Sequence, residues 1–155
     1  MAPNAKMLEQ KDWEIRLFVY RFFTSRGYPP GVQEIARHFQ MAVPDVREAV
    51  HRLHDAHALF LRPSSDDILM ANPLSAVATD YQVTVAGRRL YANCAWDALG
   101  IPAMLHADAR IEARHPLDRV LLRFSIDGGR LSSESRGLVH FAKPFRDWYD
   151  NLIDT

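Results

Sequence analysis

Apolar side chains recur at helical spacing through the first third of the chain and predict three helices. A helix is expected over residues 8–25, ended by Gly27 and the pair Pro29-Pro30. A second is expected over 32–39, and a third begins near Pro44, a residue favoured at the first helical position. Their inward stripes comprise Trp13, Ile15, Phe18, Phe22, Phe23, Ile35, Ala36, Phe39, Val46, Ala49, Val50 and Leu53.

Two short apolar runs follow these helices, residues 58–62 and 68–71, and the polar segment PSSDD between them predicts a β-hairpin. Three helices followed by a two-stranded wing is the winged-helix order. We therefore expect a winged-helix-like unit over residues 1–75. That order occurs both in proteins that bind DNA and in proteins that do not, so it predicts a fold and not a function.

The second half alternates in character and predicts a small α/β unit over residues 76–155. Strands are expected at 81–85, 111–113, 120–126 and 137–141, with a tight turn at 127–129. A helix is expected over 88–99, closed by Gly100 and Pro102, and a terminal amphipathic helix over 143–153. Together the two halves predict an α+β protein.

Composition narrows the class of protein further. The chain has 19 basic and 19 acidic residues and a formal net charge of zero, so no overall field attracts it to a polyanion. Arginines and acidic residues also balance over residues 31–62, which disfavours a nucleic-acid partner. No apolar run is long enough to span a membrane and the N-terminus lacks a signal sequence, so we expect a cytoplasmic protein.

Cys94 is the only cysteine of the chain, so it is either a buried small side chain or a reactive thiol. His51 and His54 share one predicted helix face, but no third ligand of matching type is evident, and we interpret them as solvated. His140 precedes Phe141 in an apolar run and is interpreted as a core histidine.

The stretch GRRLYANCAWDALGIP, residues 87–102, closely resembles the active-site segment of the alkylmercury lyases. Flanking segments resemble the same family: PPGVQEIA at 29–36, NPLSAV at 72–77, ADARIEA at 107–113 and VHFAKPFRDW at 139–148. The resemblance implies that cysteine thiolates hold the mercury of an organomercurial substrate while an aspartate protonates the departing carbon. It assigns Cys94 as a thiolate and metal ligand and Asp97 as the acid, with no resident cofactor.

This chemistry is physically intelligible, because a soft metal prefers thiolate and a neighbouring carboxylic acid can act as a general acid. On the predicted helix, Cys94 and Asp97 project from one face. Cys94 would lie almost two turns from the start of that helix, so we expect little help from the helix dipole.

The chain departs from the family at its second thiolate, where Ser133, Ser135 or Arg136 stands in place of cysteine. A further family cysteine falls near His115. A hydroxyl is a weak donor to mercury, so a second sulfur has to come from an external thiol.

Three functions follow from these residues. The leading one is alkylmercury-lyase-like binding of an organometal or soft metal at Cys94. The second is a Cys-dependent hydrolase, transferase or lyase acting on a small molecule, in which Cys94, Asp97 and His115 form a nucleophile–base–orienter set. The third is a winged-helix regulator or ligand-binding module.

Overall fold

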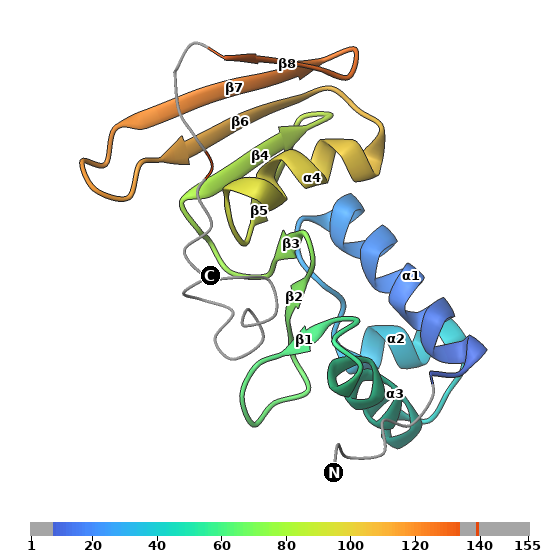
Figure 1. Ribbon diagram of the computed structural model, residues 1–155. Coiled ribbons are helices and arrows are strands. Elements are labelled where there is room, and N and C mark those ends of the chain that lie inside the picture. Colours follow the sequence, from blue (N-terminus) through green and yellow to red (C-terminus); the bar gives the residue numbers. More distant parts are fainter. Residues whose placement is uncertain (1–7, 134–138, 140–155) are drawn as a thin grey trace. The chain divides into compact units, whose positions relative to one another are not determined.

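The computed structural model describes residues 8–133 and residue 139 (Figure 1). The chain divides into two compact units, residues 1–77 and 78–155, and each is described by itself. Helices and antiparallel strands occur in both described parts, so the expected α+β class is confirmed. None of the described helices is long and apolar enough to cross a membrane.

Three helices open the N-terminal unit: α1 (Gln10–Arg26), α2 (Val32–Phe39) and α3 (Val43–Asp55). The predicted helices agree with these bounds to within two residues. Gly27 ends α1 in the left-handed conformation, with φ of 87°, because glycine carries no side chain to oppose it. The buried apolar side chains of the three helices are Ile15, Val19, Phe23, Val32, Ile35, Ala36, Val46, Ala49, Val50 and Leu53. Trp13 was expected among them, but its side chain is exposed.

A buried ion pair joins the first and third helices. Asp12 of α1 is fully buried, and Arg52 of α3 donates to both of its carboxylate oxygens, at 3.0 and 2.7 Å. The backbone N–H of Glu9 donates a further bond of 2.9 Å to the same carboxylate. Burial opposes the charge on Asp12, but these bonds outweigh it and hold the pKa of the carboxyl below its ordinary value.

Short antiparallel strands complete this unit. The predicted hairpin is present as β1 (Phe60–Leu61) and β2 (Ile68–Ala71). A further strand, β3 (Leu74–Ser75), pairs with β2 within a segment that the sequence predicts only as a connector. Two residues carry too little periodicity to be recognised from sequence.

The C-terminal unit is built on strands in the order β5-β4-β6-β7-β8, with every adjacent pair antiparallel. Helix α4 contacts β4, β5 and β6 (Figure 1). The elements are β4 (Tyr81–Val85), β5 (Arg88–Ala92), α4 (Ala95–Leu105), β6 (Ala109–Arg114), β7 (Leu121–Asp127) and β8 (Arg130–Ser133).

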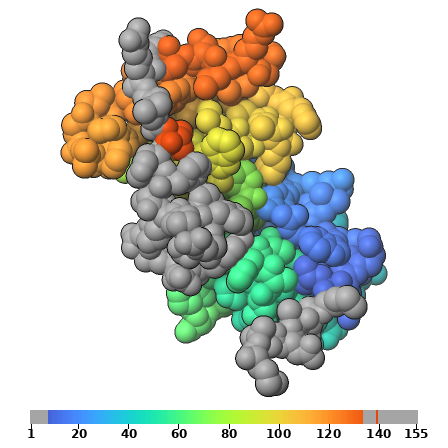
Figure 2. Space-filling model, in the orientation of Figure 1, coloured from blue at the N-terminus to red at the C-terminus, as the bar shows by residue number. Residues whose placement is uncertain are grey.

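The strands expected at 81–85, 111–113 and 120–126 are thereby confirmed with small shifts at their ends. Strand β8 was not predicted, and all four of its residues are exposed (Figure 2). It therefore lacks the alternation of buried and exposed positions that marks a strand in sequence. The strand expected at 137–141 and the helix expected at 143–153 lie outside the described residues.

The expected helix over residues 88–99 is wrong. Residues Arg88–Ala92 form strand β5, which follows β4 through a two-residue turn at Ala86 and Gly87. Both turn residues have positive φ, 48° and 74°, as the tightest hairpin turns require. Leu90 and Ala92 are buried while Arg88 and Arg89 are exposed, so this segment follows the period of a strand.

The helix that does carry the motif begins later and runs further than expected. Helix α4 starts at Ala95 and continues through Gly100 and Pro102 to Leu105, so these two residues do not close it. His106, with φ of 48°, occupies the left-handed position at its end. Ala98, Ile101 and Pro102 are buried on α4, as are Val83, Leu90 and Ile111 on the strands it contacts.

Candidate functional site

Cys94 occupies the N-cap of α4, the residue that immediately precedes the first turn. Its backbone is extended, with φ of −148°, and its half-buried Sγ accepts a hydrogen bond of 3.5 Å from the backbone N–H of Asp97. Serine, threonine and aspartate usually make this cap, so a sulfur takes the place of the ordinary oxygen acceptor. The position also corrects the expectation that Cys94 lies almost two turns into a helix.

Asp97 is the third residue of α4, and its side chain turns back toward the start of the helix. The side-chain amide of Asn93 donates to Oδ2 of Asp97 at 3.1 Å. The backbone N–H of Asp97 donates to Sγ of Cys94, so the thiol lies beside the same residue. Asn93, Cys94 and Asp97, at the start of α4, therefore bring an amide, a thiol and a carboxyl together.

The ionisation of this pair is shifted toward the protonated forms. Burial raises the pKa of Cys94, and the negative charge of Asp97 raises it further, against the hydrogen bond from the backbone of Asp97. Burial likewise raises the pKa of Asp97, although hydrogen bonds from Asn93 and Cys94 partly oppose the rise. A thiol and a carboxyl that both resist ionisation can share and exchange a proton.

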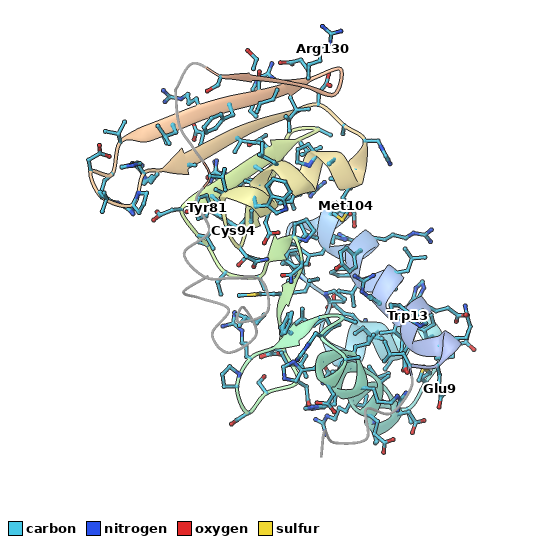
Figure 3. All side chains as sticks on the ribbon, in the orientation of Figure 1. Glu9, Trp13, Tyr81, Cys94, Met104 and Arg130 are labelled. Carbon is cyan, nitrogen blue, oxygen red and sulfur yellow. The ribbon has the colours of Figure 1, made fainter. Side chains whose placement is uncertain are left out.

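Tyr81 is a neighbour of this pair that the sequence did not indicate. It is the first residue of β4 and lies close to Cys94 (Figure 3). Burial raises the pKa of its phenol, and the charge on Cys94 contributes to the rise. Because strand residues two apart share a face, Tyr81 lies on the same side of β4 as the buried Val83. No pattern in the sequence relates a residue thirteen positions earlier to the cysteine.

His115 lies outside this group as far as the described contacts show. Its Nδ1 is 2.7 Å from Oδ1 of Asp118, three residues further along the same loop. Among residues 8–133, its hydrogen-bond partner is Asp118 and neither Cys94 nor Asp97. The structure therefore brings two of the three predicted site residues together and pairs the third with a different carboxylate.

The remaining candidates are engaged elsewhere. His51 lies 2.9 Å from Oδ1 of Asp66, and Nδ1 of His54 accepts from the backbone N–H of Leu61 at 3.4 Å. Among residues 8–133 and 139, no three His, Cys, Asp or Glu side chains gather as a metal site. Ser133, one of the residues expected at the family's second thiolate, ends β8, whereas Ser135 and Arg136 lie outside the described residues.

Comparison with known proteins gives two findings. The family described as alkylmercury lyase (MerB) matches residues 74–153, just over half of the chain. Among solved structures, the chain is similar to the crystal structure of the mercury-bound form of MerB2, with a TM-score of 0.68 and 21% sequence identity. That match covers 81% of this chain but 60% of the solved one. A search of curated proteins finds no significant match.

Proposed function

The chain belongs to the alkylmercury lyase family, and from that premise we propose that Cys94 binds an organomercurial substrate whose leaving carbon Asp97 protonates. The observation that carries this proposal is the hydrogen bond of 3.5 Å from the backbone N–H of Asp97 to Sγ of Cys94, which places the only thiol of the chain beside the residue that bears a half-buried carboxyl group. Mercury is soft and binds thiolate in preference to oxygen or nitrogen ligands, so Cys94 is the natural point of attachment.

The thiol–carboxyl contact supports a balanced first step. The sulfur of Cys94 bonds to mercury as the anion on the organomercurial leaves, and the thiol proton moves to the carboxylate of Asp97. The raised pKa of Asp97 favours this acceptance, because burial disfavours the carboxylate. After this step the carboxyl group is neutral and carries the proton that the second step consumes.

In the second step, the electron pair of the mercury–carbon bond takes the proton from Asp97. The hydrocarbon leaves, the carboxylate returns and mercury stays on the sulfur of Cys94. General acids of this kind typically accelerate proton transfers by about 10²–10⁴-fold. A second thiolate on mercury strengthens the tendency of carbon to accept the proton, and in a chain with one cysteine an external thiol supplies it. A further external thiol then exchanges for Cys94 and removes the metal.

The experiment is to incubate the protein with phenylmercury and excess small thiol and to measure benzene by gas chromatography. We expect release that exceeds a Cys94→Ser control and that depends on the external thiol. Release equal to that control would remove the lyase proposal. Capture of phenylmercury at Cys94 without benzene would leave only the binding of a soft metal or organometal.

For the N-terminal unit we retain the winged-helix interpretation of its three helices and hairpin, without a DNA-binding role. Two arginines of α3 that a nucleic acid would need are engaged by carboxylates. Arg52 binds Asp12, and Nε of Arg47 lies 2.9 Å from Asp66. An expected partner is therefore a small organometal and not a phosphate backbone.

A further inference from the structure

We propose that Asn93 is a positioning residue that orients the carboxyl of Asp97 toward the sulfur of Cys94. This inference rests on the proposed function, because the oriented group is the proposed acid. Nδ2 of Asn93 donates to Oδ2 of Asp97 at 3.1 Å, and the backbone N–H of Asp97 donates to Sγ of Cys94 at 3.5 Å. Asn93 immediately precedes the cap of α4, so its backbone is fixed by the end of β5 and the start of the helix.

The direction of this hydrogen bond decides which oxygen carries the proton. An amide N–H can only donate, so Oδ2 of Asp97 serves it as an acceptor and has no need of a proton of its own. Oδ1 is the oxygen that this bond leaves unengaged. With Oδ2 held by Asn93, rotation of the carboxyl is restricted and Oδ1 stays available to the sulfur and to a carbon bound through mercury.

The position of Asp97 makes such an anchor necessary. A carboxylate at the third position of a helix commonly folds back to the backbone N–H of the cap, as Asp12 does at the start of α1 with Glu9. At α4 the carboxyl instead accepts from the side chain of Asn93. Asn93 thereby keeps the acid at the thiol, where a backbone bond would turn it away.

The single cysteine allows a direct test, because the S–H stretching band of the protein reports Cys94 alone. We would record this band for the wild type, Asn93→Leu and Asn93→Ser, both of which lack the amide donor. Gln82→Leu is the matched control: it removes an amide from β4, where alternation places Gln82 on the face opposite to Val83. Circular dichroism verifies that each variant is folded.

We expect the band of the wild type to show a hydrogen-bonded thiol and both Asn93 variants to shift toward a free thiol, with no shift for Gln82→Leu. In single turnovers with phenylmercury and external thiol, both variants should capture phenylmercury within about threefold of the wild-type rate. Their benzene release should slow by about 10–100-fold, since misplacing a catalytic group by about 1 Å has effects of that size.

The outcomes separate the two proposals. An S–H band unchanged in both folded Asn93 variants, or benzene release at the wild-type rate, would overturn the role of Asn93 while the lyase proposal stands. A shifted band in a protein that releases no benzene would support the orienting role of Asn93 and remove the lyase proposal.

Discussion

The backbone N–H of Asp97 donates to the sulfur of Cys94 across 3.5 Å, so the proposed acid and the proposed nucleophile belong to one helix cap. The backbone of the cap fixes where the two side chains start, and the amide of Asn93 then orients the carboxyl. The carboxyl then adds a negative charge beside the thiol, and that charge together with burial raises the pKa of Cys94.

The first prediction concerns thiol reactivity. Asp97→Asn removes the negative charge beside Cys94, so the pKa of the thiol should fall and more thiolate should be present at pH 7. Below its pKa, each unit by which a thiol's pKa falls raises the thiolate fraction about tenfold. We expect the rate of alkylation by iodoacetamide at pH 7 to rise by about two- to tenfold. The rise is limited because burial of the thiol, which also raises its pKa, is unchanged in the variant.

Asp108→Asn provides the control for this measurement. Asp108 precedes β6 in the same unit, and its carboxylate accepts a hydrogen bond of 2.8 Å from the backbone N–H of Gly128. The thiol of Cys94 in Asp108→Asn should be alkylated at the wild-type rate. A slower reaction in Asp97→Asn would show that the carboxylate activates the thiol, contrary to the direction argued here.

Sequence reasoning indicated Cys94 and Asp97 as candidates but misjudged the element that holds them. The strand pattern at Leu90 and Ala92 was overlooked because Ala86 and Gly87 form a tight turn without the asparagine that usually announces one. The sequence also did not indicate that α4 continues through Gly100 and Pro102. Both have weak helix propensity, but burial of Ile101 and Pro102 outweighs it.

Some residues around the sulfur of Cys94 could be predicted from the sequence, and others could not. Cys94 and Asp97 are close in sequence, and a local motif indicates them. Asn93 is also adjacent, but its role depends on which way its amide points, and this is a consequence of the cap. Tyr81 comes from β4, and His115 is held by Asp118. Only the tertiary structure shows that Tyr81 lies near Cys94 and that His115 is bound elsewhere.

The second prediction concerns the effect of the half-buried Asp97 carboxyl on the free energy of unfolding. The folded-state pKa of Asp97 is raised, so ionisation at neutral pH opposes folding, and the loss grows as pH rises from the unfolded value of about 4 through the folded value. Asp97→Asn keeps an oxygen acceptor for Asn93 without the charge. We expect its free energy of unfolding at pH 7 to exceed that of the wild type by about 0.5–2 kcal/mol.

Urea unfolding measured from pH 7 down to pH 3 tests this expectation. The difference between the two proteins should shrink as pH falls, because Asp97 becomes neutral in both the folded and unfolded states. A variant that is less stable than the wild type at pH 7 would contradict the assignment of Asp97 as a destabilised, functional carboxyl.

The third prediction tests the hairpin that replaced the expected helix. Ala86 adopts φ of 48°, a conformation that asparagine tolerates better than alanine. Ala86→Asn should therefore raise the free energy of unfolding by about 0.5–1 kcal/mol. Gly87→Ala, with φ of 74° at that position, should lower it by about 1 kcal/mol. Changes in the opposite directions would contradict the two-residue turn at Ala86 and Gly87.

The fourth prediction separates the buried ion pair of the N-terminal unit from an exposed one on the same helix. Arg52→Met leaves the fully buried Asp12 without its guanidinium, which should cost about 3–5 kcal/mol. Arg47→Met removes a pair whose side chains are 54% and 30% exposed, which should cost less than about 1 kcal/mol. Urea unfolding at pH 7 gives both values.

The stability difference between the wild type and Arg52→Met depends on pH because the folded-state pKa of Asp12 is lowered in the wild type. A carboxyl whose folded-state pKa lies below its unfolded value stabilises the protein above the unfolded value of about 4. This contribution is lost as pH falls through the folded-state value, because the proton displaces the guanidinium. In Arg52→Met, Asp12 stays buried without the guanidinium, so its pKa should rise and the variant recovers stability as this carboxyl takes up a proton. The gap in free energy of unfolding between wild type and Arg52→Met should therefore narrow as pH falls from about 7 to about 3. A gap that is independent of pH would mean that Arg52 stabilises the unit by packing its stem and not by its charge on Asp12.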